Sequence, residues 1–65
     1  MNIYEATLIA VRTGKCIKRT TAIWEKHKIQ LKMRDVCYLC TEGKSPVPGW
    51  QPQAEDLMAD DWIMG

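Results

Sequence analysis

Apolar residues near the start of the chain recur at the spacing of an amphipathic helix. Ile3, Ala6 and Ala10 follow one another at intervals of three or four positions, and Leu8 and Val11 are three positions apart. Asn2 and Glu5 have the spacing of a capping box at the helix start. Gly14 suits the left-handed conformation that ends many helices. The pattern therefore predicts a helix over residues 3–13.

The middle of the chain changes to the alternation typical of strands. Residues 15–19 alternate, and residues 28–33 alternate most cleanly, with apolar side chains on one face and polar ones on the other. Such a pattern is typical of a half-buried antiparallel strand. Residues 34–35 are expected to form a tight turn into a returning strand over residues 36–40. The less regular residues 20–24 are interpreted as a loop or strand end.

The last third of the chain predicts a loop, a short helix and a final strand. Residues 41–49 hold two of the three prolines and two glycines, which indicates irregular backbone. A second helix is expected over residues 53–59, because carboxylates in its first turn suit the helix dipole. Residues 62–64 are expected to form the last strand. The residues expected to close the fold are Leu57, Met58, Trp62 and Ile63.

These elements indicate the α+β class: a small antiparallel sheet, an N-terminal helix and a short second helix before the last strand. The chain has 65 residues, so we expect a single domain over residues 1–65. One helix cannot cover both faces of such a sheet. We therefore expect some apolar surface to be covered by a partner subunit, which makes the protein oligomeric.

Composition excludes several partners. The net charge is +1, so no strong field favours nucleic acid polymers or an anionic membrane. No apolar run approaches the roughly 20 residues that span a bilayer, and the start of the chain lacks the pattern of a signal peptide. We therefore expect a soluble, cytoplasmic protein without a membrane or nucleic acid polymer as partner.

The cysteines do not predict a metal site or a disulfide framework. There are three of them, an odd number. Cys37 and Cys40 lie in a predicted strand, where positions three apart point to opposite faces. A structural zinc site needs about four ligands, and only Cys16 and His27 remain, without a matching spacing. We expect free thiols and no cofactor or metal.

The residues that catalysis would need are also missing from recognisable motifs. His27 is the only histidine and is flanked by lysines, a pattern typical of a solvated side chain. Ser45 lies in a proline-rich loop and outside any G-x-S-x-G motif. The glycines do not form a phosphate-binding G-x-G-x-x-G. We expect that the protein is not an enzyme.

Three aromatic residues at the ends of predicted elements are candidates for binding a ligand. Tyr4 begins the first helix, Trp24 follows a strand, and Trp50 follows the proline- and glycine-rich loop. Flat rings in such places stack on nucleobases, which is worth about 1–3 kcal/mol per base. Burial in the core explains Trp24 and Trp50 equally well, and it is the favoured interpretation for Trp62.

Charged residues could complete a nucleotide site. Arg19 could bind a phosphate through two hydrogen bonds, although a solvated strand edge explains it as well. Asp56, Asp60 and Asp61 could accept hydrogen bonds from ribose hydroxyls. Helix capping explains Asp56 almost equally well.

Several segments together resemble the second type of the Thoeris anti-defense family, which consists of small phage proteins. The most specific part is the ending Glu55-Asp-Leu-Met-Ala-Asp-Asp-Trp62. The matching segments cover nearly the whole chain: Tyr4-Glu-Ala6, Gly14-Lys-Cys-Ile-Lys-Arg19, Trp24, Ile29-Gln-Leu31 and Trp50 through Trp62. The chain differs from the family at Gln53, at residues 26–28 and in its short middle loop.

The resemblance implies a function. Such proteins are molecular sponges that bind the cyclic ADP-ribose signal of the Thoeris system without destroying it, and some relatives bind cyclic oligonucleotides at separate sites. They assemble as homotetramers with pockets between subunits. The residues that the resemblance implies for ligand binding are Tyr4, Arg19, Trp24, Trp50, Asp56 and Asp60. A structural or protein-interaction module without a nucleotide ligand is the alternative.

Overall fold

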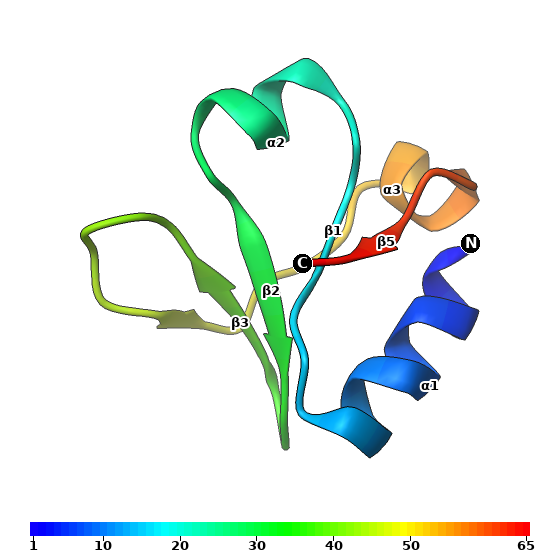
Figure 1. The fold of residues 1–65 in the computed structure, drawn as a ribbon, viewed down its shortest axis with the longest axis horizontal. Helices are drawn as coiled ribbons and strands as arrows, with labels where there is room; N and C mark the ends of the chain where they lie inside the picture. Colours follow the sequence, from blue (N-terminus) through cyan, green and yellow to red (C-terminus); the bar gives the residue numbers. More distant parts are fainter.

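The computed structural model describes all residues, 1–65, and divides them among three helices and five strands (Figure 1). The helices are α1 (Ile3–Thr13), α2 (Ala22–Lys26) and α3 (Ala54–Met58). The strands are β1 (Ile17–Lys18), β2 (Gln30–Met33), β3 (Cys37–Cys40), β4 (Val47–Pro48) and β5 (Ile63–Met64). The strands form one sheet in the order β4-β3-β2-β1-β5, with every pair antiparallel. The predicted α+β class is confirmed.

One face of the sheet carries the apolar core. Ile17 pairs with Leu31 on one side and with Met64 on the other, and Leu31 pairs with Leu39. Directly paired residues point to the same face, so these side chains form an apolar row across the strands. The small side chains of α1 that face this row, at residues 6 and 10, are at most 1% exposed. Alternation in β2 therefore predicted the correct buried face.

Helix α1 begins and ends as the sequence predicts. The Asn2 side chain accepts a hydrogen bond from the Glu5 N–H at 2.8 Å, and the Asn2 N–H donates to the Glu5 carboxylate at 3.1 Å. At the other end Gly14 has φ 74° and donates to Ala10 O at 2.9 Å. These bonds satisfy backbone groups that the helix leaves unpaired at its ends.

Helix α2 was not predicted, because residues 20–24 were interpreted as a loop or strand end. The helix ends in a Schellman motif, in which Lys28 N donates to Glu25 O at 3.3 Å and Ile29 N donates to Trp24 O at 3.0 Å. Lys28 takes the left-handed position of this motif, with φ 54°. The neighbouring strand therefore begins at Gln30, two residues later than expected.

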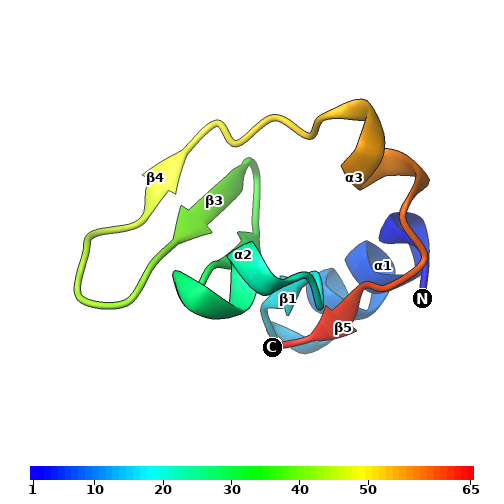
Figure 2. The ribbon, with the colours of Figure 1, turned by 90° about the horizontal axis from the view of Figure 1, so that it is seen from above.

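Strand β4 is a second correction, since residues 41–49 were expected to be loop throughout. Val47 pairs with Leu39, and Pro48 pairs with Tyr38. A proline is tolerated here because β4 is an edge strand, whose outer side needs no N–H donor. From β4 the chain crosses to the other end of the molecule, where α3 lies beside α1 (Figure 2).

The C-terminal segment closes the fold through fewer residues than predicted. Trp62 is completely buried, and it exchanges backbone hydrogen bonds with Met1 at 3.0 and 3.1 Å. Leu57 and Met58 were expected to join it, but they are 54% and 79% exposed. Only one side of a five-residue helix touches the core, and Trp62 occupies that space. No helix has the length and apolar character needed to cross a bilayer.

Candidate ligand-binding groove

A groove of about 470 Å³ lies between α2, the segment 50–53 and the start of α3. We call it the tryptophan groove. Its volume falls within the range of roughly 300–1,000 Å³ that is typical of small-molecule sites. The residues that line it are Arg19, Thr21, Ile23, Trp24, Ile29, Leu39, Trp50, Gln51, Gln53, Glu55 and Asp56.

The three tryptophans pack together beneath and beside this groove. The ring centroids of Trp24 and Trp62 are 5.4 Å apart, and those of Trp24 and Trp50 are 6.1 Å apart. Trp50 and Trp62 are separated by 6.4 Å. All three pairs meet edge to face, with interplanar angles of 78–79°. This is a preferred arrangement of aromatic rings, so the cluster fixes the orientation of each ring.

The tryptophans differ in how much ring they offer to a ligand. Trp62 is 0% exposed and Trp24 is 7% exposed, so both are core residues. Trp50 is only partly buried, and its backbone N–H donates to Cys37 O at 3.1 Å. Trp50 is therefore the ring that combines a fixed position with accessible surface in the groove.

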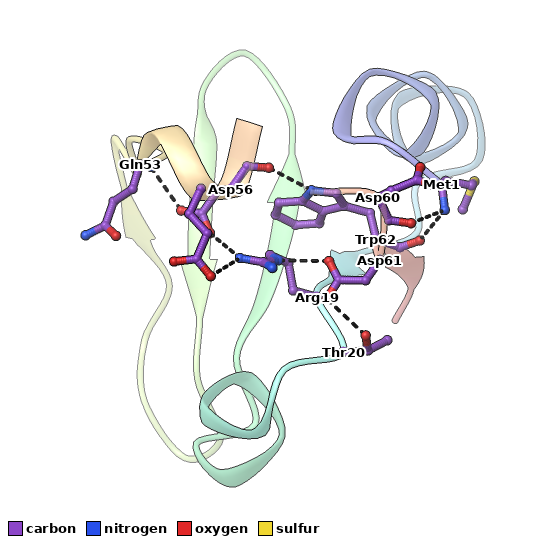
Figure 3. Close-up of polar contacts among 9 residues, drawn as sticks. Met1, Arg19, Thr20, Gln53, Asp56, Asp60, Asp61 and Trp62 are labelled. Atoms are coloured by element: carbon purple, nitrogen blue, oxygen red, sulfur yellow. Dashed lines mark hydrogen bonds and ion pairs between the residues drawn. The ribbon is translucent and has the colours of Figure 1, made fainter. Parts of the chain in front are cut away.

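Arg19 lies in the wall of the groove among three carboxylates. Its Nε donates to Asp61 at 2.9 Å, and its Nη1 donates to Asp56 at 3.0 Å (Figure 3). The same Nη1 lies 3.5 Å from Glu55, which is largely exposed. Thr20 donates to the other oxygen of Asp61 at 3.1 Å. Arg19 thus links the end of β1 to α3 and to the segment before β5.

The pKa values of this cluster shift in opposite directions. The hydrogen bond to Asp61 raises the pKa of Arg19, and the bond to Asp56 adds to the rise while burial opposes it. The bond from Arg19 lowers the pKa of Asp61, and Thr20 lowers it further against the opposing effect of burial. Both shifts favour the charged forms, so the ion pair persists at neutral pH.

Asp56 also holds the start of α3. Its second carboxylate oxygen accepts a hydrogen bond from Gln53 N at 2.9 Å, and its backbone carbonyl accepts one from Trp62 Nε1 at 3.0 Å (Figure 3). The helix-capping interpretation of Asp56 is therefore confirmed. Its contacts with Arg19 and Trp62 join the groove wall to the core.

These contacts give the tryptophan groove an aromatic and slightly acidic character. Arg19 supplies one positive charge, and Glu55 and Asp56 supply two negative charges. The guanidinium already bonds to carboxylates, which reduces its attraction for a phosphate. The groove is better suited to a flat ring or a hydroxyl-bearing sugar, because Trp50 can stack and the two glutamines and the exposed Glu55 can accept hydrogen bonds.

The structure brings together four of the six residues predicted for binding: Arg19, Trp24, Trp50 and Asp56. Tyr4 is 69% exposed on α1, and Asp60 is exposed beside the N-terminus; neither lines the groove. Sequence reasoning missed Thr21, Gln51 and Gln53. Both glutamines follow Trp50 within three residues, so their closeness to that ring in the sequence was the available signal.

Cys37 and Cys40 point to opposite faces of the sheet, as their positions in β3 require. Cys37 packs against the core, whereas Cys40 lines a separate hollow with Lys32 and Tyr38. Burial raises the pKa of the Cys37 thiol, and the neighbouring Cys40 adds to the shift. All three cysteines are free thiols, and no three His, Cys, Asp or Glu residues are grouped as metal ligands.

Comparison with known proteins gives one match. The family model described as the Thoeris anti-defense 2-like domain matches residues 1–64. No curated protein and no solved structure matches the chain. The matched range contains the whole tryptophan groove and every residue of the Arg19 cluster.

Proposed function

Because the chain belongs to the Thoeris anti-defense 2-like family, we propose that it binds a cyclic nucleotide immune signal and holds it intact. Sequestration keeps the signal from the host's antiviral effectors. The ligand is a cyclic ADP-ribose isomer, with cyclic oligonucleotides as a second class. The protein acts without catalysis, as a homotetramer, in the cytoplasm of the infected bacterium.

The observation that carries this proposal is the partly exposed ring of Trp50 in a groove of about 470 Å³. Edge-to-face contacts with two buried tryptophans hold the ring in place. A ring that is already fixed loses little conformational entropy when a base stacks on it. This arrangement supports tight binding of a planar ligand by a very small protein.

The polar groups of the groove support binding rather than bond cleavage. Asp56 bonds to Arg19 and to the backbone of Gln53, so its oxygens are occupied by structural hydrogen bonds. A general base needs an oxygen directed at a substrate proton. The groove offers a stacking ring and hydrogen-bonding groups, which suffice for recognition.

The tetramer is part of the proposal because two predicted binding residues lie outside the groove. Tyr4 and Asp60 can contribute to a site only if a second chain brings them to it. The exposed apolar residues of α1 and α3, Tyr4, Val11, Leu57 and Met58, support such an assembly. Replacing Tyr4 by alanine tests this point, because it should weaken binding only in an assembled site.

A depletion and release experiment tests the proposed activity. The protein is mixed with cyclic ADP-ribose isomers or cyclic dinucleotides, free ligand is separated by filtration, and the bound fraction is recovered by heating. We expect depletion of a cyclic ADP-ribose isomer and its return with unchanged mass and retention time. A chemically altered product would indicate an enzyme, and absence of depletion across the panel would refute the sponge.

Replacement of Trp50 by leucine should weaken ligand binding while leaving most of the core in place. Loss of a stacking ring worth about 1–3 kcal/mol lowers affinity about 5- to 150-fold. Isothermal titration calorimetry measures the change. Tyr38→Leu is the matched control, because Tyr38 lies on the opposite sheet face and outside the groove. Equal affinities of the folded Trp50→Leu variant and the parent would contradict the role of Trp50.

A protein-interaction module is the second candidate, and the exposed apolar side chains of α1 and α3 favour it. In that case Trp50→Leu alters no nucleotide binding, because there is none to alter. Light scattering together with the calorimetric titration separates the two functions.

A further inference from the structure

A second, smaller hollow lies directly beside the tryptophan groove. It has a volume of about 80 Å³, enough for several water molecules at roughly 10–15 Å³ each. We call it the lysine cleft. Trp24 and Ile29 line both hollows, so the two are neighbours across the Trp24 side chain. The residues that line the cleft are Lys18, Trp24, Glu25, Lys28, Ile29 and Gln30.

The two hollows carry opposite charge. The lysine cleft has two ammonium groups, from Lys18 and Lys28, against the single carboxylate of Glu25. Lys18 and Glu25 are 3.9 Å apart, at the limit of an ion pair, and Glu25 is largely exposed. Such a pair contributes little and is easily exchanged for another anion. The cleft therefore attracts negative charge, whereas the tryptophan groove carries one excess negative charge.

The backbone at Lys28 makes the lysine unusual at this place. It is the only residue other than glycine with a positive φ, 54°. Glycine is the residue that most often takes this position of a Schellman motif, because it has no side chain to resist the left-handed conformation. Strained residues of this kind cluster at binding sites. A lysine here gives the wall of the cleft a positively charged side chain, although its backbone conformation favours glycine.

We propose that the lysine cleft binds the phosphate part of the nucleotide whose base lies in the tryptophan groove. This assignment rests on the proposed function. In a nucleotide, a sugar separates the base from the phosphates. The two hollows lie on either side of Trp24, so one nucleotide could place its base in the groove and its phosphates in the cleft. Arg19, the cation predicted for the phosphate, is bonded to Asp56 and Asp61. Lys18 and Lys28 are the cations available beside the groove.

Titration with inorganic pyrophosphate tests the cleft without any cyclic nucleotide. Amide signals of the ¹⁵N-labelled protein report where the anion binds. We expect saturable shifts at Lys28 and Gln30 and at the Trp24 indole. Shifts that centre instead on the hollow lined by Lys32, Arg34 and Tyr38, or an absence of saturable shifts, would overturn the assignment.

Lys28→Gly gives a second test with two readouts that move in opposite directions. Glycine relieves the left-handed backbone, so the melting temperature of the free protein should rise by about 2–8 °C. Loss of the ammonium group should lower the affinity for the cyclic ADP-ribose isomer about tenfold. It should also reduce the dependence of that affinity on salt. If Lys28 had only a structural role, its replacement by glycine would not weaken ligand binding while stabilising the fold.

Lys26→Gln is the matched control, because Lys26 is an exposed lysine on α2 that lines neither hollow. Lys28→Gln removes the same charge at the cleft. If the two variants bind cyclic ADP-ribose equally well, the cleft assignment fails and the proposed function stands. If pyrophosphate binds at Lys28 but no cyclic nucleotide binds, the cleft is an anion site, and both the proposed function and the assignment of the cleft to a nucleotide fail.

Discussion

Arg19 shows how the role of one side chain depends on its neighbours in space. Its sequence context, a predicted strand rich in basic residues, allows both a solvated edge and a phosphate ligand. In the structure it is 7% exposed and bonded to Asp56 and Asp61, far along the chain. No local pattern encodes such pairing. Arg19 lies in the wall of the groove, and its bonds to carboxylates could not be predicted.

Asp61→Asn should change how stability responds to acid. The pKa of Asp61 is lower in the folded state than in the unfolded state, where it is about 4. The ionised carboxylate therefore adds to the free energy of unfolding above about pH 4, and this stabilisation is lost as the pH falls further. The raised pKa of Arg19 has no effect in this range, because the guanidinium stays charged. The parent should therefore lose stability steeply below about pH 4. The variant should be less stable at pH 7, and its stability should fall less steeply as the pH is lowered.

Thermal melts between pH 2 and pH 7 measure this effect. Asp60→Asn serves as the control, since the Asp60 side chain makes no ion pair and only its backbone carbonyl is bonded. If the melting temperatures of the Asp61→Asn variant and the parent fall equally steeply with decreasing pH, the Arg19–Asp61 pair does not stabilise the fold.

At the level of elements, patterns within one segment were reliable and patterns that depend on packing were not. The capping box and Gly14 fixed the bounds of α1, because their hydrogen bonds join residues three or four apart. Helix α2 was missed because Thr20, Thr21 and Ile23 are β-branched, and its five residues are too few for a periodic signal. Burial of Trp24 and the Schellman motif hold it in place, and both require tertiary contacts.

Helix α3 depends on Arg19 in a similar way. It has no buried residue of its own, and its ties to the core are the Arg19–Asp56 ion pair and the bond from Trp62 to the Asp56 carbonyl. Propensity predicted that the helix exists. It could not predict that Leu57 and Met58 face outward, because their orientation follows from where Asp56 is held.

Arg19→Leu should destabilise the protein and loosen α3 first. Removing one partner of a buried ion pair costs about 3–5 kcal/mol. Because Asp61 is one-third exposed and can be solvated again, we expect the free energy of unfolding to fall by roughly 2–4 kcal/mol. Urea denaturation measures the loss, and hydrogen exchange should show reduced protection in α3. Lys18→Leu is the control and should cost less than about 1 kcal/mol, because its partner Glu25 is largely exposed and lies 3.9 Å away. A similar loss of stability in both variants would contradict the proposal that the Arg19–Asp56 ion pair holds α3 in place.

The whole molecule leaves considerable apolar surface uncovered for its size. Side chains of α1 and α3 contribute most of it, and these two helices lie side by side (Figure 1). Large exposed apolar patches in small proteins commonly mark interaction surfaces. The sequence predicted that the uncovered apolar surface would lie on the sheet, because one helix cannot cover both of its faces. Most of the exposed apolar side chains lie instead on the two helices, and Leu57 and Met58, which were expected in the core, are among them.

Met58→Lys should therefore disrupt the proposed tetramer without disrupting the fold. Met58 is 79% exposed in the single chain, so a lysine there meets water unless another chain covers it. We expect a smaller mass by light scattering and an unchanged circular dichroism spectrum. Val47→Lys is the control, because Val47 is 56% exposed on the edge strand β4, away from these helices. Dissociation by Val47→Lys alone would place the interface at the sheet edge.

The pairing between the two ends of the chain affects when the protein can fold during its synthesis. Trp62 fills the centre of the core and bonds to Met1, 61 positions earlier. Strand β1 gains its second neighbour only from residues 63–64. Contacts between such distant positions form late and together. The core therefore cannot close before Trp62 and residues 63–64 have been synthesised, and a chain cut before Trp62 should fail to fold.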